Sequence, residues 1–208
     1  MDIGPERDND GVALARLWLL RHGETEWSLT RRHTGRTDKP LTAHGEEQAR
    51  ALKVRLAEQP FTRVVTSPLL RARDTCTIAG FPEAETEDDL MEWDYGAYEG
   101  RTTAEIREDD PDFSIWTAPL VGETVDTVGA RADRILARVG DLEGEVALFA
   151  HAHTLRILAA RWLGLDAVYG RRFMLATASL SILGHEHGYR TIARWNDTSH
   201  FSPSDTTF

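Results

Sequence analysis

The stretch LWLLRHGETEWS, residues 17–28, places an arginine, a histidine and a glycine directly after a short apolar run. Residues 15–20 have the length and apolar character of a buried strand, so Arg21 and His22 are predicted to lie just past its carboxyl end. In open α/β sheets, binding sites form outside the carboxyl ends of parallel strands. The stretch therefore predicts a buried sheet and a site at the end of its first strand.

Strand-like runs alternate with helical patterns along the rest of the chain. In chain order, the expected elements lie at residues 15–20 (strand), 43–59 (helix), 61–67 (strand), 68–80 (helix), 104–108 (helix), 125–139 (helix), 145–150 (strand), 154–164 (helix) and 178–197 (two strands about a glycine-containing turn). This alternation predicts an α/β fold, a three-layer sandwich. Its mostly parallel central sheet has helices on both faces and a C-terminal antiparallel hairpin.

Two helix starts are indicated by residues suited to capping. Thr42 precedes the helix at 43–59, and its hydroxyl can accept a hydrogen bond from the first turn. Ser67 and Pro68 have the residue types of an N-cap and a first helical position, so they are predicted to open the next helix. Helix starts near Pro68 and His153 would present backbone N–H groups to an anion at the strand ends.

The composition fits one domain. With 208 residues, 41% of them hydrophobic, the chain can bury one sizeable core. We expect a flexible N-terminal segment at 1–14, a single domain at 15–196 and a loose C-terminal tail at 197–208. No apolar run approaches the ~20 residues of a membrane span, and residues 1–16 lack the apolar segment of a secretory signal. A cytoplasmic location is expected.

The charge distribution favours a small anionic ligand. A formal net charge of −10 argues against a protein that binds nucleic acid through its general field. A few arginines in a cleft can nevertheless outweigh a distant global field. Three strand ends supply cationic groups, namely Arg21 with His22, Arg71 and His151. Because the ends of neighbouring parallel strands converge, we predict a pocket for a dianion such as phosphate.

Six segments in a fixed order resemble a known family. LLRHGETEW, TGRTDKPLTAHGEEQA, TSPLLRARDT, EWDYGAYEG, GETV and FAHAHTLR together resemble the histidine phosphatase superfamily, which includes the cofactor-dependent phosphoglycerate mutases. The resemblance runs from Leu17 to Trp162. The wording of EWDYGAYEG and AHAHTLR is closer to the acid-phosphatase and sugar-bisphosphatase branches than to the mutases.

The resemblance implies a metal-independent phosphatase that acts through a phosphohistidine intermediate and needs no cofactor. A neutral imidazole is a competent nucleophile towards phosphorus, and His22 takes that role. Arg21 and Arg71 stabilise the charge on the phosphoryl oxygens, and His151 is a third stabilising group. Glu92 is the general acid and then the general base.

The family pattern is needed to select that carboxyl group. The residue types alone leave Asp88, Asp89, Asp94 and Glu99 open as alternatives to Glu92. Glu24, next to the Arg-His-Gly run, is interpreted as an orienting partner for that wall of the pocket and not as the general acid.

A second set of residues is expected to bind the substrate. Ser28, Thr34 and Gly35 match positions where relatives contact phosphate oxygens. Ala152 stands where relatives usually have glycine, so the backbone there either avoids a positive φ or is slightly altered. His153 either reads the non-reacting part of the substrate or caps the following helix, and the sequence leaves both open.

Other functions compete with that of a phosphatase. A phosphoglycerate mutase would have to shield its phosphohistidine from water, and a non-catalytic phospho-ligand binding module is opposed by the intact catalytic set. His185 and His187 suggest a metal site, but the Asp-rich clusters of two-metal phosphatases are missing, so no metal is expected. The lone Cys76 is interpreted as a small core residue. The expected partner is a small phosphorylated metabolite, with no nucleic acid and no membrane, and a homodimer is left open.

Overall fold

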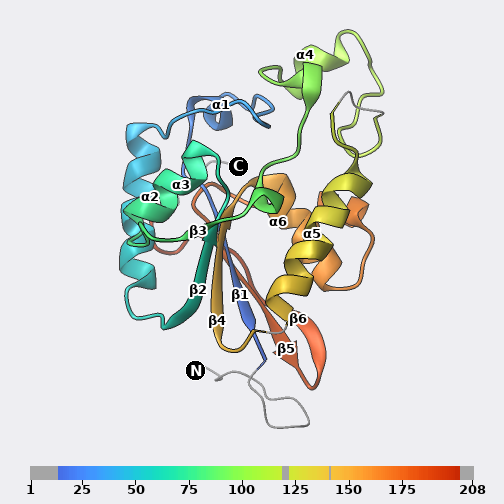
Figure 1. Cartoon of the computed structure of the whole chain (residues 1–208). Coiled ribbons are helices and arrows are strands. Elements are labelled where there is room, and N and C mark those ends of the chain that lie inside the picture. The colour runs from blue at the N-terminus through green and yellow to red at the C-terminus, as the bar shows by residue number, and fades with distance from the viewer. Residues whose placement is uncertain (1–13, 119–121, 141, 202–208) are drawn as a thin grey trace.

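The computed structural model describes residues 14–118, 122–140 and 142–201 (Figure 1). A six-stranded sheet runs through it in the order β3-β2-β4-β1-β5-β6. The strands are β1 (Arg16–Arg21), β2 (Phe61–Thr66), β3 (Glu85–Thr86), β4 (Glu145–Ala150), β5 (Leu180–Glu186) and β6 (Tyr189–Asp197). The first four in the spatial order pair in parallel, whereas β5 and β6 are antiparallel. The predicted α/β sandwich and its C-terminal hairpin are confirmed.

Helices cover both faces of this sheet, α2 and α3 on one and α5 and α6 on the other (Figure 1). The α-helices are α1 (Glu26–Leu29), α2 (Ala43–Leu56), α3 (Leu70–Ile78), α4 (Thr103–Arg107), α5 (Val125–Gly140) and α6 (Ala152–Trp162). Three short 3-10 helices are η1 (Asp88–Leu90), η2 (Gly96–Tyr98) and η3 (Ala167–Arg172). Every helix in the described ranges falls short of the length and apolar character needed to cross a bilayer.

The two-residue period of β1 divides the core into two layers. Leu17 and Leu19 pack in the cluster that contains the apolar residues of α5 and α6. Trp18 and Leu20 pack on the opposite face with residues of α2 and α3, including Cys76. Successive strand side chains point to opposite faces, so a strand buried on both sides must be apolar throughout. This burial fixes β1 and hence the position of the residues that follow it.

One predicted helix start is confirmed and the other is wrong. Thr42 caps α2 by accepting a hydrogen bond from Gly45 N at 3.0 Å. Ser67, by contrast, continues the pairing of β2 with β4 through Ser67 N and Phe149 O, and the N-cap of α3 is Leu69. The N–H of Leu70, at the start of α3, instead donates to Asp38 Oδ1 at 2.8 Å, and Asp38 lies in a loop distant in the sequence.

The ends of the chain are described in part. Residues 1–13 and 202–208, which carry most of the expected N-terminal segment and tail, lie outside the described residues. Within the expected tail, His200 Nε2 donates to Ala178 O at 2.9 Å and Phe201 packs against the core layer that holds Trp18. The stretch at 197–201 therefore rests against the domain.

Candidate active site

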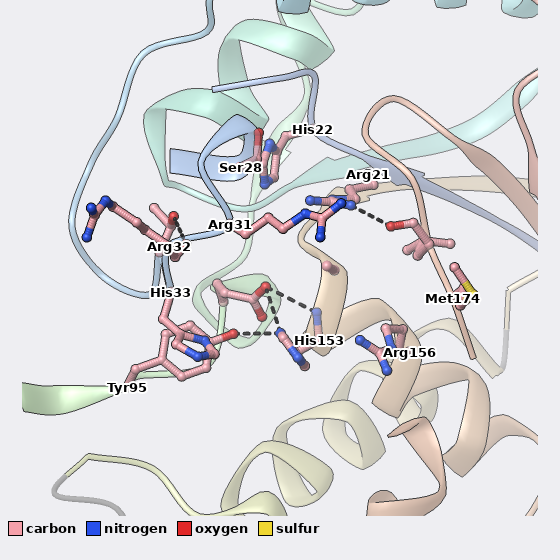
Figure 2. Close-up of a pocket in the computed structure, with 14 residues that line it drawn as sticks. Arg21, His22, Ser28, Arg31, Arg32, His33, Tyr95, His153, Arg156 and Met174 are labelled. Carbon is pink, nitrogen blue, oxygen red and sulfur yellow. Dashed lines mark hydrogen bonds and ion pairs between the residues drawn. The ribbon is translucent and has the colours of Figure 1, made fainter. Parts of the chain in front are cut away.

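A pocket with a volume of about 340 Å³ opens at the carboxyl ends of β1 and β4 (Figure 2). Its walls come from β1 and the loop after it, from the segment at 92–95, from the start of α6 and from residues 174–175. This volume lies at the small end of the range for metabolite sites. The pocket therefore suits a small molecule and lies where an α/β sheet places its ligands.

Two histidines lie side by side at the carboxyl ends of β1 and β4, because these strands are neighbours. Arg21 on β1 is paired with Ala150 on β4, so His22 and His151 are the next residue on each strand. His22 N donates to Ala150 O at 3.0 Å, and the two imidazole centroids are 5.2 Å apart. Strand register thus brings together two residues that are far apart in the sequence.

The His22 imidazole is held in the form that a nucleophile needs. Its Nδ1 is 2.7 Å from Gly23 O, and because a carbonyl only accepts, the proton lies on Nδ1 and the lone pair on Nε2. Burial lowers the pKa of His22 well below its usual value, with further lowering by the charges of Arg71 and Arg21. His22 is therefore neutral at neutral pH.

Glycine after His22 is required by packing. A Cβ on Gly23 would lie 2.4 Å from Gly45 O in the first turn of α2, and Gly23 N donates to Thr75 Oγ1 at 3.0 Å. Gly23 has no positive φ, so this close packing, and not an unusual backbone conformation, accounts for the glycine. Glu24 Oε1 accepts from Thr42 Oγ1 at 2.9 Å, so this carboxylate ties the loop after β1 to the start of α2.

Arg21 and Arg71 are buried cations with donors to spare. Arg21 Nη1 donates to Leu175 O, and the Arg71 guanidinium donates to backbone carbonyls at Thr34, Gly35 and Thr37. Burial lowers the pKa of Arg21 to about 10 and also lowers that of Arg71, while the carboxylate of Glu92 opposes both changes. Nε of each arginine is buried without a hydrogen-bond partner among the described residues.

His151 adds a third donor of this kind. Its Nε2 lies 2.8 Å from Ser67 Oγ, and its buried Nδ1 has no partner in the described part of the chain. Ser67 Oγ already accepts from Leu69 N, which favours donation of its hydroxyl proton to Nε2 and leaves the imidazole proton on Nδ1. Burial, followed by the charge of Arg71, lowers the pKa of His151 well below its usual value. His151 is thus a neutral donor.

Glu92 lies against the N-terminus of α6. Its Oε1 accepts from Trp93 N at 2.9 Å and from both N and Oγ1 of Thr154 at 3.1 Å, and its Oε2 accepts from His153 N at 3.1 Å. Helix N-termini bind anions because their first N–H groups are unpaired within the helix. The carboxylate is therefore held rigidly at the pocket wall, 4% exposed.

The residues predicted from the sequence lie at two depths, some in the pocket wall and others buried beneath it. The pocket itself is lined by Arg21, His22, Ser28, Thr34, Glu92, Ala152 and His153. Arg71 and His151 are fully buried beneath it, and Gly35 is not part of its lining. A Cβ on Gly35 would lie 2.3 Å from Glu99 Oε1, so close packing requires this glycine.

Local hydrogen bonds engage the predicted substrate-binding side chains. Ser28 Oγ and Thr25 form the capping box of α1, and Thr34 Oγ1 donates to Arg32 O. Ala152 begins α6 without a positive φ, which is the first of the two expected outcomes. The His153 ring bonds through Nδ1 to Tyr95 OH at 2.7 Å, while the N-cap of α6 is His151.

Other residues that line the pocket were not predicted from the sequence. These are Arg31, Arg32, His33, Tyr95, Arg156, Met174 and Leu175. For Arg156 a signal was available, since it follows Ala152 by four residues and so lies on the same face of the helix. Tyr95 lies within the EWDYGAYEG segment, but its burial and its bond to His153 depend on the tertiary fold.

The described residues hold no group of three or more His, Cys, Asp or Glu side chains arranged for a metal ion. His185 on β5 packs on Trp162 with ring centroids 5.0 Å apart, and His187 lies in the hairpin turn with φ 51°. Cys76 is buried, and burial raises the pKa of its thiol to about 12. These positions favour a structural role for His185, His187 and Cys76.

Comparisons with known proteins agree on one family. The model of the histidine phosphatase superfamily (branch 1) matches residues 17–198. An acid phosphatase of Mycobacterium tuberculosis is 42% identical over 93% of this chain and 98% of its own length. A sedoheptulose 1,7-bisphosphatase of Saccharomyces cerevisiae is 37% identical over 71% of this chain and 67% of its own. The solved structure of the open reading frame Rv3214 from M. tuberculosis has a TM-score of 0.83 and 41% identity, covering 88% of this chain and 97% of that one.

Proposed function

Because the chain belongs to branch 1 of the histidine phosphatase superfamily and is a phosphatase, we propose that it hydrolyses small phosphomonoesters through a phosphohistidine on His22. The observation that carries the role of the site is that Arg21, Arg71 and His151 lie close enough around His22 to act electrostatically on it or on one another. Each of the three also has a buried donor, Arg21 Nε, Arg71 Nε or His151 Nδ1, with no partner among the described residues. Buried donors are almost always paired, so a ligand with several acceptor oxygens accounts for all three. A phosphoryl group is such a ligand.

The first step transfers the phosphoryl group to the protein. The lone pair of His22 Nε2 attacks phosphorus, and the bond from phosphorus to the ester oxygen breaks with its electrons on that oxygen. Protonated Glu92 gives its proton to this leaving oxygen, so an alcohol departs. Arg21, Arg71 and His151 stabilise the charge on the three remaining phosphoryl oxygens.

The second step restores the enzyme. Water attacks the phosphorus of phosphohistidine while the Glu92 carboxylate takes a proton from it. The bond between phosphorus and Nε2 breaks, its electron pair returns to His22, and phosphate leaves. Glu92 is protonated again, and the cycle consumes one water molecule. None of these steps draws on a metal ion.

The names of similar proteins suggest which substrates to assay first. Similarity to a protein named acid phosphatase and to one named sedoheptulose 1,7-bisphosphatase supports sugar phosphates as the first compounds to assay. The absence of nucleic-acid and membrane partners, the open question of a homodimer and the cytoplasmic location stay predictions from the sequence.

A trapping experiment tests the mechanism. We expect p-nitrophenyl phosphate hydrolysis to persist in EDTA, and rapid acid-free quenching to recover an acid-labile phosphoryl group on His22. His22→Ala should lose both turnover and label. Loss of activity with chelator would contradict the metal-free mechanism, and interconversion of 2- and 3-phosphoglycerate faster than phosphate release would show a mutase instead.

A further inference from the structure

Glu99 does not line the pocket, yet its carboxylate accepts three hydrogen bonds from the loop that holds Arg71. Oε1 accepts from Arg36 N at 2.6 Å, and Oε2 accepts from Thr37 N at 2.8 Å and from Thr37 Oγ1. The sequence left Glu99 open as an alternative to Glu92, and the proposed reaction does not use it. A carboxylate with three donors beside a catalytic arginine therefore needs an explanation.

The same loop holds the Arg71 guanidinium through its carbonyl oxygens. Arg71 Nη2 donates to Thr34 O at 3.0 Å and to Gly35 O at 2.9 Å, and Nη1 donates to Thr37 O at 3.2 Å. Arg71 is fully buried, and its Nε has no partner within the described ranges. Because a guanidinium is planar, holding both Nη atoms fixes the direction of the N–H on Nε. The loop at 34–37 therefore decides where Arg71 directs its remaining donor.

One peptide unit connects the two side chains directly. The bond between Gly35 and Arg36 carries both Gly35 O, which accepts from Arg71, and Arg36 N, which donates to Glu99. This peptide is trans, so its C=O and N–H point in opposite directions, one towards the cation and the other towards the carboxylate. Hydrogen bonds to charged groups are the stronger ones, and bonds in a chain polarise one another. Glu99 thus strengthens the hold of the peptide on Arg71.

Glycine at position 35 allows this arrangement. A Cβ there would lie 2.3 Å from Glu99 Oε1 and 2.5 Å from Trp93 O, so the carboxylate lies directly against the loop backbone. Burial lowers the pKa of Arg71, while the negative charge of Glu92 most strongly, and that of Glu99 less strongly, opposes this change. Glu99 therefore acts on Arg71 through its charge as well as through the peptide.

We infer that Glu99 is a positioning residue, which directs the Arg71 guanidinium at the phosphoryl group through the Gly35–Arg36 peptide without touching the substrate. The inference rests on the proposed phosphatase function, and it assigns Gly35 to the support of Arg71 and not to the binding of substrate. The alternative is that Glu99 only braces the loop. In that case its loss would lower stability and leave the chemistry of folded molecules unchanged.

A glutamine variant separates these two roles. Glu99→Gln removes the charge and sets an NH2 group against a backbone N–H, so it cannot accept all three hydrogen bonds. We expect kcat/KM for p-nitrophenyl phosphate to fall about 10- to 100-fold, the effect of a misplaced catalytic group. This ester is chosen because its leaving group needs no proton from Glu92. Urea unfolding followed by circular dichroism gives the folded fraction, and rates are expressed per folded molecule.

A double-mutant cycle shows whether Glu99 acts through Arg71. In an Arg71→Gln background, Glu99→Gln should cost almost nothing, because the guanidinium that it positions is absent. If turnover in that background is too slow to measure, the affinity for inorganic phosphate by calorimetry gives the same cycle. Thr37→Val removes only the hydroxyl donor at an exposed position, and it provides a milder test if Glu99→Gln folds poorly. We expect from it a smaller fall in kcat/KM that also disappears without Arg71.

Asp94→Asn is the matched control for the loss of charge. Asp94 lies in the same segment as Glu99, and its Oδ1 accepts from Gly96 N at 2.8 Å, a bond that asparagine can keep. The variant removes an equal charge without changing a hydrogen bond to the loop at 34–37. It should leave kcat/KM unchanged.

Three results overturn the positioning role and leave the proposed function intact. They are an unchanged kcat/KM per folded molecule in Glu99→Gln, an equal loss with and without Arg71, and an equal loss in Asp94→Asn. Failure of the proposed function looks different, because the unchanged protein then releases phosphate from no ester and carries no label on His22.

Discussion

At His22, burial together with Arg71 and Arg21 holds the imidazole pKa well below 6.5. A lowered histidine pKa means that the neutral nucleophile persists as pH falls through 6.5 and is lost only at a distinctly lower pH. We predict that the acid limb of kcat/KM lies well below pH 6.5. The measurement is a pH profile between 4 and 8 with an ester whose own titration is corrected for. A limb near 6.5, matched by the NMR titration of His22, would contradict this account.

At Glu92, the proposed acid role predicts a dependence on the leaving group. Glu92→Gln keeps an acceptor for the N–H groups of α6 but cannot give up a proton. We expect kcat for alkyl phosphates to fall about 10²- to 10⁴-fold, and for p-nitrophenyl phosphate to fall far less, because nitrophenolate leaves without protonation. Asp88→Asn, at an exposed carboxylate that begins η1, is the matched control and should change neither rate. Equal slowing of both esters would remove Glu92 from the acid role.

At the scale of elements, α5 holds the segment that carries Glu92. The Arg131 side chain binds both carboxylate oxygens of Glu123, at 2.7 and 2.8 Å, and donates to the carbonyls of Asp89 and Met91 at 2.7 and 2.8 Å. We predict that Arg131→Ala lowers the free energy of unfolding by about 2–4 kcal/mol, because the largely buried Glu123 carboxylate keeps only Arg36 Nη2 at 3.3 Å as a cationic partner among the described residues and the Asp89 carbonyl loses its donor. It should also lower kcat, since Glu92 loses its support.

Urea unfolding followed by circular dichroism measures this change. Arg50→Ala, which removes the arginine of an exposed pair with Glu46 on α2, is the control and should have a much smaller effect. If both variants shift the midpoint equally, the buried pair is not what secures the segment.

Some helices and strands could be predicted from the sequence and others could not. Strands β1 and β4 can be predicted from their apolar runs, and α2 from its capping threonine, because these signals are local. The start of α3 was not predictable, since Asp38, 32 residues earlier, supplies the acceptor for Leu70 N. When the capping group comes from a separate loop, the sequence next to the helix carries no sign of it.

For the whole molecule, the predictable part of the site is the part fixed by strand topology. His22, Arg71 and His151 follow three neighbouring parallel strands, so their convergence can be reasoned from order alone. Arg31 reaches the pocket through a left-handed backbone after α1, and Tyr95 through its burial and its bond to His153. Neither feature can be read along the chain, so the phosphoryl site was predictable and these parts of the pocket wall were not.

The whole fold also predicts that a bound anion stabilises the protein. Folding buries Arg21 and Arg71 with Nε atoms that no described residue pairs, and a phosphate that pairs them binds only the native state. A ligand at 100 times its Kd adds about 2.7 kcal/mol of stability. For a domain of this size, that amounts to a rise in Tm of roughly 5–10 °C.

Thermal unfolding with increasing inorganic phosphate measures this rise, with chloride at equal ionic strength as the control for screening. Arg21→Met should abolish the rise, because it removes one of the unpaired donors and the charge that attracts the anion. The same substitution should cost the ligand-free protein little, since it also removes a buried charge. Equal rises in chloride and phosphate, or an unchanged rise in Arg21→Met, would mean that the buried donors are not the phosphate site.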